Sequence, residues 1–420
     1  MEPNRLTALD AARAIAAGRL SATDLMEACL ARAEEREEVV HAFVHLDRGL
    51  ARRAATRARP GPLSGLPFGV KDVLDTADMP TGYGSPIWAG HRPRGDSAVV
   101  AAARAAGAVI MGKTVTTEFA TRNPGPTTNP HNPAHTPGGS SSGSAAAVAD
   151  FMLPLAFGTQ TAGSIIRPAA YCGVVGFKPS YGSLHRGGMK VCSEGLDTIG
   201  VMARSVADCG LAIGAMTGMP MDPEAKLSRA PRLGLSLGQA PGAAAPETVA
   251  RLHEVAEAAR RAGAEVREFA LPPALEEAAA LHAHMMNMET RQALAWEWAV
   301  ARAEISPVLR ERLEWAEAQP AEKLLESRLA SKAARAAFLD ATQGLDAILT
   351  PSAPAEAPEG LGYTGDATFN LLWTLLWGPN VTIPAGTGPK GLPLGVQLVG
   401  RIGEDAGLLA TARWVQAAIG

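Results

Sequence analysis

The sequence predicts an α/β fold, because short apolar runs typical of buried strands alternate with amphipathic helical runs along its 420 residues. Apolar residues make up 47% of the chain and the formal net charge is −3, which is typical of a chain that buries a large core. No uninterrupted apolar run is long enough to span a bilayer. We therefore expect a globular chain of one large domain or two.

The helical runs begin near the N-terminus. The stretch from Leu6 to Arg36 predicts two amphipathic helices, and Ser21 opens a capping-box pattern at the start of the second. Further helices are expected over Ser205–Met216 and Glu247–Ala262. The segment 272–342 is rich in alanine and charged residues, and we expect it to form a helical covering layer at the mouth of a pocket.

The strand candidates are short and apolar, and most are bounded by glycine, proline or polar residues. They are Ala42–Leu46, Pro67–Val70, Ala108–Met111, Leu153–Phe157, Leu233–Leu237, Ala347–Thr350 and Val396–Val399.

Composition narrows the possible functions. The chain has no basic excess that would indicate binding to nucleic acid or to an anionic membrane. The N-terminal residues lack the apolar core of a signal peptide, and the cysteines are few, so we expect a cytoplasmic protein. The four cysteines lack paired zinc spacing and the nine histidines are dispersed, so we expect neither a metal nor another cofactor.

One motif match is misleading. Residues 107–114 fit the phosphate-loop pattern G-x-x-x-x-G-K-[ST]. A phosphate loop follows a strand and opens a helix, but here a helical run comes first and Ala108–Met111 is itself an apolar strand. Nucleotide binding is therefore not expected.

Two serine-containing segments are the most informative feature of the chain. The run Gly138–Ser144 contains four serines, and it lies between a proline-rich stretch and a helix start, unlike a flexible linker. The run Gly158–Ser164 follows an apolar strand, and its small residues allow backbone N–H groups to converge on one point. A lone lysine, Lys71, lies upstream in Gly-Val-Lys-Asp. Together these segments supply a nucleophile, a proton relay and a base.

These segments resemble the amidase signature family of Ser-Ser-Lys hydrolases, and the resemblance covers most of the chain. It is densest from Gly65 to Pro179 and continues in Leu196–Gly200 and Ala203–Asp208, with weaker matches in Asn380–Ala385 and Gly391–Gly400. The resemblance implies a large mixed, twisted β-sheet sandwiched by helices. It also implies a single domain over 1–420, with a signature core at about 62–215 and the helical layer at about 272–342.

By position, the resemblance makes Ser164 the nucleophile, Ser140 the bridging serine and Lys71 the general base. It also implies a cis peptide bond between Gly139 and Ser140. The other serines of the first run are then expected to hydrogen-bond within the loop. The backbone N–H groups expected to form the oxyanion hole are those of Thr161, Ala162, Gly163 and Ser164.

This mechanism requires an uncharged Lys71, whereas an ordinary lysine has a pKa of about 10.4. Its apolar neighbours in the sequence predict burial, which lowers the pKa of a lysine. Asp72 follows directly, but successive strand residues point to opposite faces, so the two side chains need not pair.

The chain departs from the commonest family pattern at three positions. Ser142 replaces a usual glycine, Gln160 stands where many members have aspartate, and Ala162 stands where many have glycine. None of these changes removes a catalytic atom. Gln160 argues against the branch of tRNA-dependent amidotransferases, in which aspartate is usual.

Arg167 is the main candidate for substrate specificity. It follows Ser164 by three residues, as in the short malonamidase-type members, where the arginine holds a substrate carboxylate. The alternative is a structural ion pair or hydrogen bonds to loop carbonyls. The further candidates for the pocket wall are Tyr83, Phe119, Met189 and Trp373. Trp373 and Trp377 are four apart on a helical run, a spacing that also fits core packing.

The resemblance predicts an amidohydrolase that cleaves a small amide C–N bond through a serine acyl-enzyme. A carbamate, urethane or biuret-type hydrolase is the nearest alternative. A second alternative is an amidotransferase subunit that acts on misacylated tRNA with partner subunits, and a third is a catalytically silent binding scaffold. The expected partner is a small-molecule amide, and a homodimer is compatible with the sequence.

Overall fold

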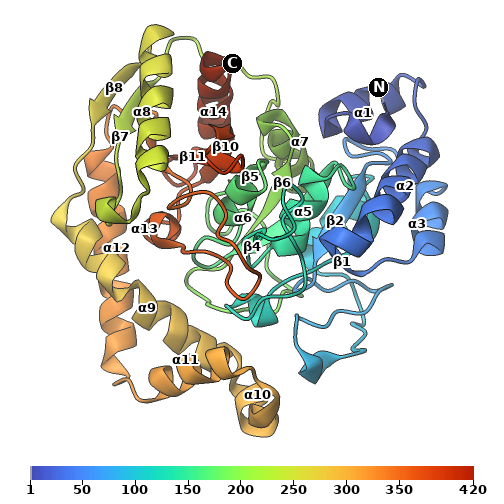
Figure 1. Ribbon diagram of the computed structural model, residues 1–420, viewed down its shortest axis with the longest axis horizontal. Helices are drawn as coiled ribbons and strands as arrows, with labels where there is room; N and C mark the ends of the chain where they lie inside the picture. Colours follow the sequence, from blue (N-terminus) through green and yellow to red (C-terminus); the bar gives the residue numbers. More distant parts are fainter. Residues whose placement is uncertain (1) are drawn as a thin grey trace.

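The computed structural model describes residues 2–420 and contains one mixed sheet of eleven strands. The sheet order is β1-β3-β2-β4-β6-β5-β10-β11-β9-β7-β8, and helices cover both sides of the sheet (Figure 1). The predicted α/β fold is therefore confirmed. The strands are β1 Phe43–His45, β2 Pro67–Lys71, β3 Val109–Thr114, β4 Leu155–Gln160, β5 Val175–Lys178, β6 Thr198–Ala203, β7 Arg232–Leu235, β8 Glu265–Glu268, β9 Ala347–Pro351, β10 Asn380–Thr387 and β11 Pro393–Val399.

The local sequence explains several helix starts. Ser21 accepts a hydrogen bond from the Asp24 N–H, as the capping-box pattern predicts, and Ser205 accepts one from Asp208 in the same way. The helices are α1 Ala8–Ala16, α2 Ala22–Val40, α3 Arg48–Ala55, α4 Ala98–Ala105, α5 Ser142–Ala149, α6 Ile166–Tyr171, α7 Val206–Thr217, α8 Pro246–Arg261, α9 Pro273–Ala293, α10 Ala295–Val300, α11 Pro307–Glu317, α12 Glu322–Ala341, α13 Thr368–Leu375 and α14 Asp405–Ile419.

The central strands bring the two motif regions together. Strand β2 pairs in parallel with both β3 and β4, with Phe68 opposite Leu155 and Gly69 opposite Ala156. Parallel neighbours end at the same edge of a sheet, so Lys71 at the end of β2 lies beside the end of β4. Helix α5 packs against β2, β3 and β4, and helix α6 packs against β5, β10 and β11. The loops that enter both helices carry the serine segments.

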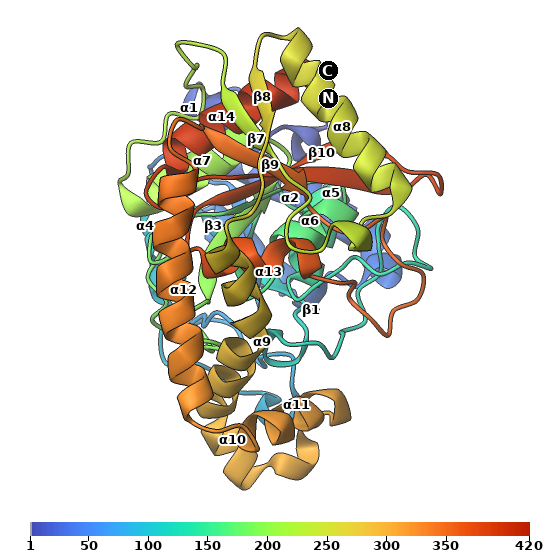
Figure 2. The ribbon, with the colours of Figure 1, turned by 90° about the vertical axis from the view of Figure 1, so that its left-hand side faces the viewer.

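The segment 273–341 forms the helical layer α9 to α12. Helices α9 and α12 pack along each other and extend away from the sheet, with α10 and α11 at the far end (Figure 2). Buried carboxylates join this layer to the rest of the chain. Glu289 accepts hydrogen bonds from the Ser193 hydroxyl and the Gly195 N–H, and Glu297 accepts one from the Trp88 indole. In residues 2–420 no helix is both long and apolar enough to cross a membrane.

All seven strand candidates lie in strands, but the sequence reasoning did not identify β5, β6, β8 and β10. Strand β8 lies at the sheet edge with largely exposed side chains, so it shows little apolar pattern. The other three contain glycine, or proline and glycine, which normally mark turns. Pairing on both sides within the sheet stabilises these strands in spite of their composition.

Candidate active site

Lys71 lies at the end of β2 with no exposed surface. Its amine nitrogen Nζ is 2.7 Å from the Ser140 hydroxyl, 2.7 Å from the Thr159 hydroxyl and 3.3 Å from the Thr159 carbonyl oxygen. The carbonyl can only accept a hydrogen bond, so an N–H of Lys71 points toward it. An uncharged amine keeps a lone pair that can accept the Ser140 proton. The structure thus brings together two of the three expected catalytic side chains.

Burial lowers the pKa of Lys71 to about 7, and the charge of Arg167 acts in the same direction. The carboxylate of Asp197 opposes this shift without cancelling it. Asp72 does not pair with Lys71; its carboxylate lies 3.1 Å from the buried amine of Lys113. Lys113 is the lysine of the phosphate-loop pattern at residues 107–114. It lies inside β3, and this agrees with the expectation that the pattern covers a strand and not a phosphate loop.

The first serine run forms a buried loop and the start of α5. The Gly139–Ser140 peptide bond is cis, as the resemblance implied. Ser144 donates a hydrogen bond to the Phe157 carbonyl at 2.7 Å, and Ser142 donates to the Val115 carbonyl at 3.4 Å. The Ser141 hydroxyl accepts a hydrogen bond from the Thr159 N–H at 3.3 Å. These serines therefore fix the loop against β4 and the end of β3, as expected for the members of the run other than Ser140.

The loop after β4 presents free backbone N–H groups. Within residues 2–420, the N–H groups of Thr161, Ala162, Gly163 and Ser164 donate no hydrogen bond to the protein. A substrate oxygen that approaches this loop can accept hydrogen bonds from N–H groups that need not leave another partner. This is the arrangement that an oxyanion hole requires.

Side chains hold this loop in its compact shape. The side-chain amide oxygen of Gln160 accepts hydrogen bonds from the Ile165 and Ile166 N–H groups, which bends the loop back onto the strand end. The Thr161 hydroxyl donates to buried Asp197 at 2.5 Å. Gly163 allows a close approach, because a Cβ there would lie 2.3 Å from the Asn370 side-chain oxygen. The loop therefore keeps its compact shape with Gln160 in place of the usual aspartate.

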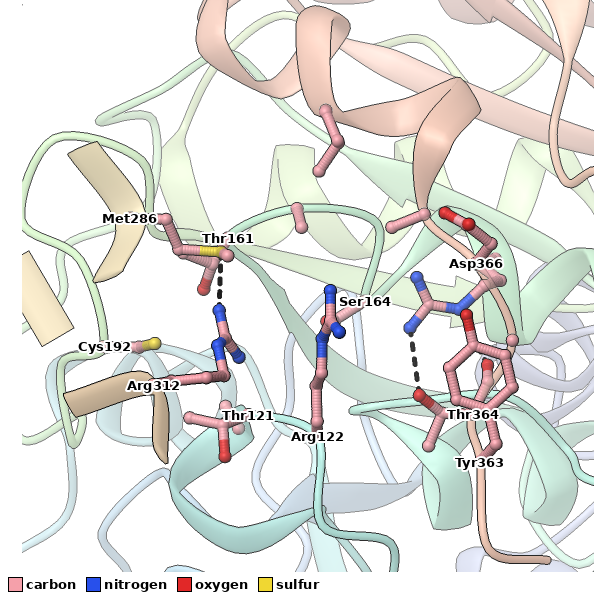
Figure 3. Close-up of a pocket in the computed structure, with 16 residues that line it drawn as sticks. Thr121, Arg122, Thr161, Ser164, Cys192, Met286, Arg312, Tyr363, Thr364 and Asp366 are labelled. Carbon is pink, nitrogen blue, oxygen red and sulfur yellow. Dashed lines mark hydrogen bonds between the residues drawn. The ribbon is translucent and has the colours of Figure 1, made fainter. Parts of the chain in front are cut away.

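Ser164 lines a pocket with a volume of about 90 Å³. One water molecule needs about 10–15 Å³ of such space, so the pocket suits a small ligand. Figure 3 shows Thr161 and Arg312 to one side of Ser164, and Thr364, Tyr363 and Asp366 to the other. The Ser164 hydroxyl forms no hydrogen bond within the described residues, whereas the Ser140 hydroxyl is bonded to Lys71.

Arg167 also lines this pocket, but backbone oxygens hold its guanidinium. Nε donates to the Thr364 carbonyl at 2.9 Å, and one Nη donates to the Gly139 carbonyl at 2.6 Å. This geometry matches the alternative in which Arg167 binds loop carbonyls. Because Gly139 precedes Ser140, Arg167 also fixes the peptide next to Ser140.

The other four pocket candidates do not line the pocket that contains Ser164, and the position of Trp373 matches the core-packing alternative. Trp373 is fully buried in an apolar cluster, 6.2 Å from the Phe338 ring. Tyr83 and Phe119 belong to a separate buried cluster under the helical layer, and Met189 packs into the main core. Proximity to a motif in the sequence did not place any of these side chains at the pocket.

Trp377 does not share a helical face with Trp373. Helix α13 ends at Leu375, and Trp377 follows it with a left-handed φ of 67°. Its ring stacks on Tyr181 at 4.4 Å, and its indole N–H donates to the Gly195 carbonyl at 2.7 Å.

Because Trp373 is a core residue, its truncation should change stability and not substrate binding. We expect Trp373→Ala to lower the free energy of unfolding by about 3–5 kcal/mol and to leave KM unchanged. Chemical denaturation followed by fluorescence measures the first effect, and steady-state kinetics measure the second. Trp296→Ala is a suitable control, because Trp296 is 53% exposed and its loss should cost less than about 1 kcal/mol. A raised KM with normal stability would instead place Trp373 at the pocket.

Sequence reasoning missed several residues of the site. Thr159 contacts Lys71 from β4, and its position inside the Gly158–Ser164 run was the only available signal. Arg122, Arg312 and the loop 363–366 line the pocket from three distant parts of the chain. No motif marks them, and Arg312 lies in the helical layer that was expected to shape the pocket mouth.

The chain is similar to known proteins in both sequence and fold. The profile of the amidase family matches residues 24–409. The A subunit of glutamyl-tRNA(Gln) amidotransferase from Cereibacter sphaeroides is 34% identical over 500 aligned positions, which cover 100% of this chain and 98% of that protein. A crystal structure of an amidase superposes with a TM-score of 0.90 and 31% identity, covering 99% of this chain and 100% of that one. Native peptide amidase from Stenotrophomonas maltophilia has a TM-score of 0.80 and 28% identity, covering 99% and 97%.

Fold and similarity together define a hydrolase that acts on C–N bonds. The chain belongs to the amidase family, whose profile covers most of its length.

Proposed function

We propose that this amidase hydrolyses a small amide through an acyl-enzyme on Ser164. The observation that carries the proposal is the buried amine of Lys71, which lies 2.7 Å from Ser140 and has a pKa lowered to about 7. The free N–H groups of the Thr161–Ser164 loop also support the proposal, because they can stabilise the oxyanion that forms when Ser164 attacks. The small pocket around Ser164 suits a short acyl group.

In this mechanism, uncharged Lys71 takes the proton of Ser140 while Ser140 takes that of Ser164. The Ser164 oxygen attacks the amide carbon, and the loop N–H groups stabilise the resulting oxyanion. The proton then returns along the same path to the leaving nitrogen, and the C–N bond breaks. Water attacks the acyl-enzyme with the same relay, and a carboxylate leaves.

One alternative is that the chain is an amidotransferase subunit. It is similar over its full length to the A subunit of such an enzyme. An activity of that kind would require partner subunits. Gln160 argues against it, because this residue occupies the position of the aspartate usual in that branch. Carbamate or ureido hydrolysis is the nearer alternative, since it uses the same nucleophile and oxyanion hole.

A panel of small substrates separates these functions. We expect the purified single chain to release ammonia from short primary amides or half-amides, and to act more slowly on carbamates and ureas of equal size. Ammonia release measured enzymatically gives kcat/KM for each compound. A chain that hydrolyses carbamates or ureas best would belong to the alternative class. A chain inactive alone but active with added amidotransferase partners would support the function in tRNA-dependent amidation.

A further inference from the structure

Three arginines surround the pocket that contains Ser164. Arg122, Arg167 and Arg312 line it, and Asp366 is the one acidic side chain among the lining residues. Within residues 2–420 none of the three arginines forms an ion pair, although twenty-one ion pairs occur elsewhere in the chain. A pocket lined mainly by one sign of charge attracts ligands of the opposite sign.

The arginines differ in what already binds them. Arg167 is held by the Thr364 and Gly139 carbonyls. Arg312 donates to the side-chain oxygen of Asn287 and lies 3.8 Å from the Met286 sulfur, both neutral groups. The side chain of Arg122 has no hydrogen bond to residues 2–420 and is exposed at the pocket. Arg122 and Arg312 therefore keep N–H groups free for a ligand.

Arg122 and Arg312 lie close enough for their charges to interact. Burial lowers the pKa of Arg312 to about 10, and the positive charge of Arg122 adds to this effect. Two guanidinium groups without an acidic partner repel each other, and an anion between them removes that repulsion. The planar fork of each group matches a carboxylate. In the view of Figure 3, Arg122 lies between Arg312 and the Asp366 carboxylate.

We propose that Arg122 and Arg312 bind a carboxylate of the substrate, so that the enzyme prefers half-amides of short dicarboxylic acids over neutral amides. This inference rests on the proposed amide hydrolysis at Ser164. It assigns the recognition of charge to these two residues, while Arg167 fixes the loop beside Ser140.

Kinetics on matched pairs test the preference. Malonamate, succinamate and glutaramate each have a neutral counterpart of equal chain length in propionamide, butyramide and valeramide. We expect the wild-type enzyme to prefer a charged member, and the double variant Arg122→Gln/Arg312→Gln to lose about 10- to 100-fold of that preference in kcat/KM. For the neutral amides the loss in kcat/KM should be smaller, because they have no carboxylate for these two residues to bind. Arg261→Gln is the matched control, because Arg261 is exposed on α8 and its loss changes the net charge in the same direction.

Binding of inert dicarboxylates separates this inference from the proposed function. Calorimetry with malonate, succinate and glutarate should detect binding to the wild type and to Arg261→Gln, and weaker binding to the Arg122→Gln and Arg312→Gln variants. Such binding without hydrolysis of any amide would refute the proposed function and keep the carboxylate site. Neutral amides that are hydrolysed as well as charged ones, or an equal loss for both in the variants, would overturn the carboxylate site. Absence of binding by all three dicarboxylates would overturn it too.

Discussion

Ser164→Ala should abolish amide hydrolysis, with a loss of at least about 10⁴-fold in kcat. The hydroxyl is the only atom of this residue that can form the acyl bond, whereas its backbone N–H stays in the loop. Because the side chain forms no hydrogen bond within the described residues, its removal should leave the fold unchanged. Steady-state ammonia release measures the activity, and far-UV circular dichroism checks the fold.

Labelling by a fluorophosphonate provides a readout that does not depend on the substrate. The wild type should gain one adduct, located on Ser164 by peptide mass spectrometry, and Ser164→Ala should gain none. Ser142→Ala is the matched control: within the described residues the only hydrogen bond of its hydroxyl is a long one, 3.4 Å, to the Val115 carbonyl, so labelling and turnover should persist. Equal turnover by Ser164→Ala would show that another group is the nucleophile.

Lys71→Ala should lower kcat/KM by about 10²- to 10⁴-fold, the range typical of a lost general base. The fold should persist, because the residue removed is a buried amine that is costly to charge and not an apolar core side chain. In the wild type, kcat/KM for a neutral amide should rise about tenfold per pH unit below pH 7 and level off above it. The sign follows from the lowered pKa: below about 7 the amine is protonated and cannot accept the Ser140 proton, and above it the amine is free.

Lys178 supplies the control for this pH profile. Burial lowers its pKa to about 7 as well, but its amine donates to the Pro179 and Gly378 carbonyls and not to a serine. Lys178→Met should therefore keep the rise in kcat/KM around pH 7. A profile that becomes flat in Lys178→Met, or one that never varied between pH 5.5 and 9, would contradict the role of Lys71.

Local sequence determined the elements and the chemistry that depend on residues close together in the chain. The capping pattern at Ser21 gave the start of α2, and the apolar runs gave seven of the strands because buried strands need apolar side chains. The resemblance to the amidase signature family marked Lys71 and Ser140, which the structure places in contact. The small residues of the Gly158–Ser164 run marked the loop with free N–H groups.

The tertiary structure alone decided the composition of the pocket wall. Arg122 follows β3 in the sequence, Arg312 lies on α11 and Asp366 precedes α13, so only the packing of the helical layer against the sheet makes them neighbours. The same packing places Trp373 in one buried cluster and places Tyr83 and Phe119 in another, away from Ser164. Burial, which lowers the pKa of Lys71, also comes from contacts across the whole fold. Sequence patterns report on the chemistry of each segment, whereas contacts between distant segments arise only when the chain packs.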